Sequence, residues 1–165
     1  MLKKYIIVFF ISMVPLVELR GAIPIGISNA FGGSLPIIPL YLICILGNML
    51  PVPFIYLFAR KVLLWGKDKK VIGKFFTWCL EKGEKGGKKL EQKAGNKGLF
   101  VALLLFVGIP LPGTGAWVGT LASSILDMDF KTSIAAVMLG VILAGIIMGL
   151  ASAGVFGTLG AVFAS

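Results

Sequence analysis

The stretch Pro15–Pro24, with the sequence PLVELRGAIP, decides how the rest of this chain is interpreted. It holds a carboxylate, Glu18, and a guanidinium, Arg20, two residues apart, and the chain on either side is almost wholly apolar. A later apolar stretch is interrupted in a similar way at Pro110–Trp117, with the sequence PLPGTGAW. Because proline removes a backbone donor and glycine favours turns, each stretch predicts a broken helix. We interpret the two breaks as parts of one site inside a membrane.

The composition predicts an all-α integral membrane protein with a single membrane domain, 1–165. Of the 165 residues, 58% are hydrophobic, and the mean hydropathy is +0.98. Asp, Glu, Lys and Arg are absent from 22–59, 98–126 and 132–165. Each of these runs exceeds the roughly 20 apolar residues that one membrane span needs.

The positive charge is concentrated between the apolar halves. The net charge is +9, and twelve of the sixteen Lys and Arg fall in 60–97. The positive-inside rule predicts that this connector is cytoplasmic. We expect a multi-pass protein of the plasma (cytoplasmic) membrane. The start, Met1–Lys4 followed by an apolar run, imitates a signal peptide, but no small-residue cleavage motif follows, so we expect it to be retained.

The connector contains an amphipathic pattern with helical spacing. Its apolar positions are Ile72, Phe75, Phe76, Cys79 and Leu80. Such a helix lies either on the membrane surface, with its lysines toward anionic lipid headgroups, or against the protein's own cytoplasmic end. The sequence leaves both arrangements open.

The two halves share one plan, so the sequence predicts an internal repeat. Repeat 1 covers about 1–59 and repeat 2 about 98–165. Each has a short helix, a broken segment, a second short helix and a full span. The first short helices are predicted at 5–14 and 99–109, the second at 25–31 and 118–126, and the spans at 36–59 and 132–157. In the first half the break is expected to run through Glu18–Pro24.

Two topologies fit this plan. If each broken segment is a re-entrant hairpin, each half crosses the membrane once, and the repeats are inverted, as in alternating-access transporters. If each broken segment crosses, the chain has four spans in parallel repeats with both termini inside. The short helices favour the inverted arrangement, whereas Lys3 and Lys4 favour the parallel one.

Three stretches carry a resemblance to a known family. They are ELRGAIP at 18–24, GNMLPVP at 47–53 and PLPGTGAW at 110–117, and with them the chain resembles the small multidrug export protein family over nearly its whole length. That resemblance implies a membrane exporter. The layout is also similar to the DedA (SNARE-associated, VTT-type) membrane proteins, which have paired re-entrant hairpins. This similarity implies transport of polyprenyl-phosphate lipids. The second hairpin here lacks a clear arginine motif of that type.

Glu18 and Arg20 are the first candidates for function. Ionisable groups at membrane depth are costly and usually functional. A buried Glu18 could bind and release a proton, and Arg20 could bind phosphate or carboxylate through two N–H groups. The alternative is a neutralising structural pair that fixes the hairpin tip.

The remaining candidate substrate- or ion-binding residues come from the broken helices. They are Pro24, Asn48, Pro110, Pro112, Gly113, Thr114 and Trp117. Broken helices expose backbone groups that bind ions, although proline and glycine also act as plain hinges. Asn48 could bind a substrate or instead satisfy a carbonyl freed by Pro51.

Three further features have structural interpretations. Asp127 and Asp129 are expected at a water interface, as a cap for the last helix. Gly145 and Gly149 allow close helix approach, either between two chains or within one. Cys44 and Cys79 suggest neither a disulfide nor a metal site.

We therefore expect a small secondary transporter or exporter that is coupled to the proton gradient. We expect it to work as a homodimer, because two spans and two hairpins make only a thin wall around a substrate path. The alternatives are a DedA-like lipid-phosphate translocase and a non-transporting membrane scaffold. No histidine, no paired nucleophile and base, and no cluster of metal ligands is present in the sequence, so we expect no enzyme activity, cofactor or nucleic-acid partner.

Overall fold

The computed structural model describes residues 2–28, 34–67, 74, 77, 81, 92, 95, 97–111 and 113–163. Within these ranges the chain forms helices joined by short turns, with no strand. The helices are α1 (Leu2–Met13), α2 (Glu18–Ile27), α3 (Ile37–Met49), α4 (Pro51–Lys67), the helix Lys97–Gly108, α6 (Ala116–Ile125) and α7 (Phe130–Phe163).

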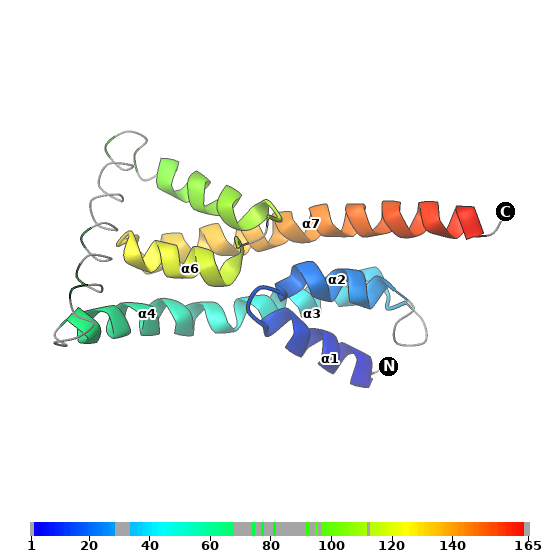
Figure 1. Ribbon diagram of the computed structural model, residues 1–165, viewed down its shortest axis with the longest axis horizontal. Helices are drawn as coiled ribbons and strands as arrows, with labels where there is room; N and C mark the ends of the chain where they lie inside the picture. The colour runs from blue at the N-terminus through cyan, green and yellow to red at the C-terminus, as the bar shows by residue number, and fades with distance from the viewer. Residues whose placement is uncertain are drawn as a thin grey trace.

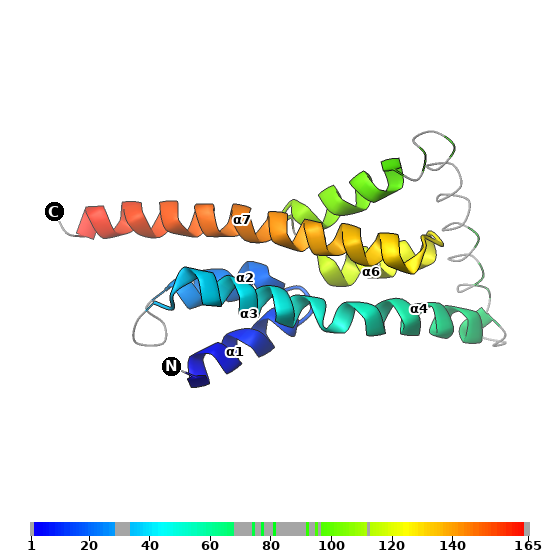
Figure 2. The same cartoon turned by 180° about the vertical axis from the view of Figure 1, so that it is seen from behind.

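Two long helical segments form the frame of the molecule. In Figures 1 and 2, α3 and α4 follow one another in nearly one line, and α7 runs beside them in the opposite direction. The hairpin of α1 and α2 lies beside α3, whereas the hairpin of Lys97–Gly108 and α6 lies near α4. Accordingly α1 packs on α2 and α3, α2 on α3 and α7, and α6 on α4 and α7. The tips of the two hairpins meet near the middle of the molecule.

The long segments match the two predicted spans. Ile37–Ala59 and Phe130–Ser152, each of 23 residues, are long and apolar enough to cross a membrane. Leu50 forms a bend between α3 and α4, because Pro51 and Pro53 supply no N–H to the preceding turn. The helix then continues past the predicted end at residue 59, to Lys67.

The predicted break through Glu18–Pro24 is wrong. The turn lies at residues 14–17, and α2 begins at Glu18 and contains Pro24. Leu16 and Glu18 have φ angles of 70° and 51°, which turn the chain between α1 and α2. Pro24 supplies no backbone N–H to α2, and the helix nevertheless continues through it to Ile27.

The second break is confirmed. The helix Lys97–Gly108 ends, and α6 begins at Ala116. Gly113 and Gly115 between them have φ angles of 79° and 123°, a region that favours glycine. The amphipathic helix predicted over 72–80 lies outside the described residues except at Lys74 and Thr77, so it stays a prediction.

The two halves use the same kind of contact between hairpin and long helix. A Cβ on Gly47 of α3 would lie 2.6 Å from the carbonyl oxygen of Phe9 in α1. A Cβ on Gly140 of α7 would lie 2.8 Å from the carbonyl oxygen of Leu104 in the second hairpin. In each half a glycine therefore lets the long helix touch the backbone of the first hairpin helix.

Gly145 and Gly149 serve packing within one chain. Gly149 faces Tyr41 of α3 so closely that a Cβ would overlap its hydroxyl, and that hydroxyl donates a hydrogen bond of 2.8 Å to the carbonyl of Gly145. The small residues thus bring α3 and α7 together. Asp129 caps α7 as predicted, with Oδ2 accepting a 2.9 Å hydrogen bond from the Thr132 N–H.

Candidate functional site at the meeting of the hairpin tips

Glu18 binds the beginning of α6. Its side chain is buried, and Oε2 and Oε1 accept hydrogen bonds of 3.1 Å each from the backbone N–H groups of Ala116 and Trp117. The first N–H groups of a helix have no partner within the helix and carry partial positive charge. Sequence reasoning expected helix ends here to attract an anion, and the anion in the structure is the carboxylate of the other hairpin.

Arg20 binds the end of the preceding helix. Its Nη1 donates to the carbonyl of Leu111 at 2.6 Å, and its Nη2 donates to those of Val107 at 3.0 Å and Ile109 at 3.3 Å. The last carbonyls of a helix lack helical partners and carry partial negative charge. The guanidinium therefore neutralises the end of Lys97–Gly108. Its Nε is buried and has no hydrogen-bond partner within the part of the chain that the structure describes.

The two charged residues together join the hairpins at both sides of the second break. Glu18 holds the helix that follows the break, and Arg20 holds the helix that precedes it. Residues two apart on a helix do not share one face, and here they reach two different helix ends. Both residues lie in the first turn of α2, and in the structure they connect the hairpins. Substrate or ion binding by Glu18 and Arg20 stays a prediction.

Three other residues shape the contact. Gly115 approaches the Glu18 carboxylate closely, since a Cβ would lie 2.4 Å from Oε2. Thr114 Oγ1 donates to the carbonyls of Leu111 at 2.8 Å and Ile109 at 3.1 Å, so its hydroxyl stabilises the turn at the tip of the second hairpin. The indole N–H of Trp117 donates a hydrogen bond of 3.1 Å to the carbonyl of Met13, and this bond connects α6 to the end of α1.

The other predicted site residues lie apart from these hydrogen bonds. Pro110 and Gly113 belong to the tip of the second hairpin, and Pro112 lies outside the described residues. Pro24 lies inside α2, half-buried.

Asn48 is a different kind of candidate. It lies in α3 just before the bend and is 1% exposed, and among the described residues neither Nδ2 nor Oδ1 has a hydrogen-bond partner. The alternative that Asn48 satisfies a carbonyl freed by Pro51 is therefore wrong. A buried amide without partners is costly, so it marks a position where a water or ligand group could bind.

Sequence reasoning missed the importance of Gly115 and of the backbone groups. Glu18 and Arg20 bind backbone N–H and carbonyl groups of the second hairpin. Every residue type carries a backbone carbonyl, and every type except proline carries a backbone N–H. No residue pattern could identify them. Gly115 could have been found, because a second glycine after Gly113 indicates an unusual backbone or a close approach.

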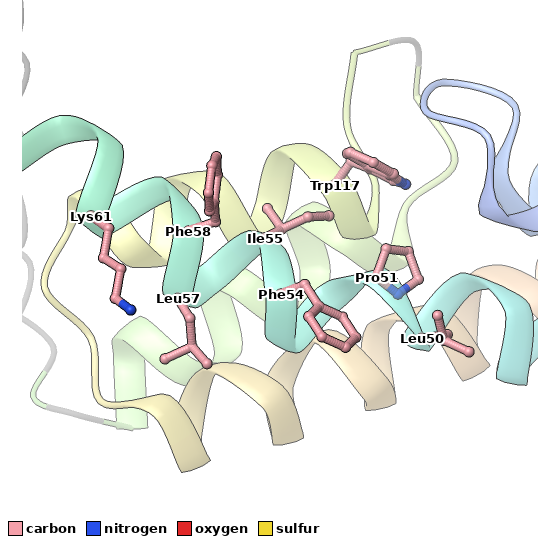
Figure 3. Close-up of a pocket in the computed structure, with 8 residues that line it drawn as sticks. All are labelled: Leu50, Pro51, Phe54, Ile55, Leu57, Phe58, Lys61 and Trp117. Atoms are coloured by element: carbon pink, nitrogen blue, oxygen red, sulfur yellow. The ribbon is translucent and has the colours of Figure 1, made fainter. Parts of the chain in front are cut away.

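An open apolar groove of about 440 Å³ runs along α4 beside this contact. Figure 3 shows Lys61 at one end, Leu50 and Pro51 at the other, and the ring of Trp117 extending from the start of α6. The wall of the groove is almost entirely apolar. Trp117 therefore takes part both in the contact between the hairpins and in the groove.

The fold and site define a helical membrane protein in which charged groups from one hairpin bind the helix ends of another. The family described as "Putative small multi-drug export protein" matches residues 18–147, and the chain belongs to this family. The match begins at the first residue of α2, after the turn at residues 14–17, and includes the tip of the second hairpin. Neither the curated proteins nor the solved structures gave a match.

Proposed function

We propose that the chain exports small molecules by a path between two re-entrant hairpins, arranged as an inverted repeat in the plasma membrane. The family description supports export. The opposite directions of α3–α4 and α7 in Figure 1 support the inversion, as do the equivalent contacts of Gly47 and Gly140. Two hairpin tips that meet inside the molecule form a barrier that transport would have to open.

The bond between the Glu18 carboxylate and the start of α6 is the observation that carries this proposal. A charged carboxylate is a stronger acceptor than a neutral one and also interacts with the helix dipole. Protonation of Glu18 would weaken its hydrogen bonds to the start of α6 and remove its interaction with the helix dipole. The contact between the two hairpins would then be weaker. Proton binding would then favour opening, and export would be coupled to the proton gradient.

Flux in proteoliposomes tests this coupling. Purified protein would be assayed with a panel of cationic and anionic fluorescent dyes, with and without a pH gradient, and with pyranine inside to report proton movement. We expect the gradient to change the flux of at least one dye. Glu18→Gln should remove that response while Glu81→Gln, the same change at an exposed position of the connector, should keep it. A Glu18→Gln protein that still follows the gradient would rule out the coupling.

The role of Arg20 argues against the lipid-phosphate alternative. Both of its Nη groups already bind carbonyls, so gripping a phosphate would require these bonds to break. If the protein were instead a scaffold without transport activity, Glu18→Gln and Arg20→Ala would leave every activity unchanged while the fold survives.

Cysteine accessibility tests the hairpins themselves. In a background of Cys44→Ser and Cys79→Ser, single cysteines across 15–24 and 110–117 would be labelled from each side of the membrane. Inverted hairpins predict that the two tips open to opposite faces, and a cytoplasmic label in the connector 60–97 fixes the orientation. Crosslinking of the same variants would test the expected homodimer. Labelling of both tips from one side only, with both termini cytoplasmic, would contradict the inverted arrangement.

A further inference from the structure

The groove along α4 extends from the edge of a predicted span to its middle. The candidate span ends at Ala59, so Lys61 lies just beyond it, where headgroups are expected. Ten residues of helix separate Pro51 from Lys61, which corresponds to about 15 Å. This is half of the roughly 30 Å hydrocarbon thickness of a bilayer. The groove therefore has the length of one leaflet.

The chemistry of the groove changes along this length. Lys61 provides a positive charge at its outer end, and most of the Lys and Arg of the chain follow in the connector. Phe54 and Phe58 are both 68% exposed and provide an apolar surface along its course. Trp117 and Pro51 close the inner end. A positive end followed by an apolar channel complements a molecule with an anionic head and a single long apolar chain.

We propose that an anionic phospholipid binds in this groove, with its headgroup at Lys61 and one acyl chain running along α4 to Trp117. The inference rests on the membrane position of α3–α4 and not on export. The bound chain would touch Trp117, whose backbone N–H binds Glu18 and whose indole binds the carbonyl of Met13. Lipid composition would thereby act on the residue that fastens the two hairpins together.

Quenching of Trp117 fluorescence tests the site. The chain has three tryptophans, so Trp65→Phe with Trp78→Phe leaves Trp117 as the only emitter. This protein would be placed in phosphatidylcholine vesicles in which a fixed fraction of the lipid is brominated phosphatidylglycerol or brominated phosphatidylcholine. We expect a relative binding constant about five-fold higher for phosphatidylglycerol, the ratio that one lysine near an anionic surface supplies. Bromines near the end of the acyl chain should quench more strongly than bromines near the headgroup.

Charge variants separate the groove from general attraction of anionic lipid. Lys61→Gln should remove the preference and Lys61→Arg should keep it. Lys131 is the second residue of α7, and Lys61 lies in the last two turns of α4. In Figure 1 the start of α7 and the end of α4 lie at the same end of the molecule, so Lys131→Gln is the matched control and should keep the preference. Equal quenching by both lipids, an equal loss in the Lys131→Gln protein, or no quenching because a second copy covers the groove would each overturn the proposal.

Discussion

Gly115 and Glu18 lie so close that a Cβ on Gly115 would be 2.4 Å from the Glu18 carboxylate oxygen Oε2. The backbone of Gly115 also has a φ angle of 123°, which side chains other than glycine rarely accept. The position therefore requires glycine for two separate reasons. One of them depends on a residue that is remote in the sequence.

Gly115→Ala should destabilise the contact between the hairpins. We expect the free energy of unfolding to fall by about 2 kcal/mol or more, because overpacking costs about 1–3 kcal/mol and the backbone is strained as well. Thermal unfolding in detergent would measure this loss. Gly154→Ala in α7 is the control, because no described residue outside the backbone of α7 and the two chain neighbours lies within 4 Å of the added Cβ. An unchanged melting temperature for Gly115→Ala would show that the tips do not meet as described.

Arg20→Gln should leave the end of the helix Lys97–Gly108 without its cation. Hydrogen bonds to charged groups contribute about 1.5–3 kcal/mol, so we expect a loss of about 2–3 kcal/mol in reversible unfolding in mixed micelles. Arg20→Lys should recover only part of the loss, because one ammonium cannot reproduce the forked contacts with three carbonyls. Lys97→Gln, at an exposed position of the same helix, should behave like the wild-type protein.

Asn48→Leu should affect the stability of the fold and the export activity in different ways. Because both polar atoms of the buried amide lack partners among the described residues, an apolar side chain of similar size should leave the free energy of unfolding unchanged or raise it. If Asn48 binds a water or a substrate group on the export path, dye flux should fall in the same variant. Wild-type flux in a well-folded Asn48→Leu protein would remove Asn48 from the path.

Gly149→Ala should clash with Tyr41 of the same chain. A Cβ there would overlap the Tyr41 hydroxyl, so we expect a loss of about 1–3 kcal/mol in the free energy of unfolding. Tyr41→Phe alone removes one hydrogen bond to Gly145, worth about 1 kcal/mol. The double variant should lose less free energy of unfolding than the two single variants lose together, since the hydroxyl that would overlap the new Cβ is absent. Additive losses would contradict the contact.

The cap of α7 should make stability depend on pH. Hydrogen bonds from the Thr132 side chain and the Thr132 backbone N–H lower the pKa of Asp129. A carboxyl with a lowered folded-state pKa stabilises the protein fully above its unfolded pKa, near 4, and loses this contribution as the pH falls through the folded value. Asp129→Ala should therefore melt lower than wild type at pH 7, by an amount equivalent to about 1 kcal/mol. This difference should shrink below pH 4, and a gap that stays constant to pH 3 would disprove the assignment.

Local sequence patterns were sufficient for the positions of most helices. Apolar runs of known length place α3–α4 and α7, because the bilayer sets the length of a span. Gly113 and Gly115 mark the second break, because the backbone there needs positive φ angles. The first break was misplaced, since Pro24 fits inside α2 and the residues that turn the chain, Leu16 and Glu18, give no turn pattern in the sequence.

The sequence by itself determined that Glu18 and Arg20 are the ionisable residues to explain in an apolar setting, because charge at that depth is costly. Only the tertiary structure decided what they bind. Their partners are backbone N–H and carbonyl groups at helix ends, and these groups are the same for every residue type. Which helix end meets which side chain depends on how two hairpins, about a hundred residues apart in the chain, pack against α3 and α7.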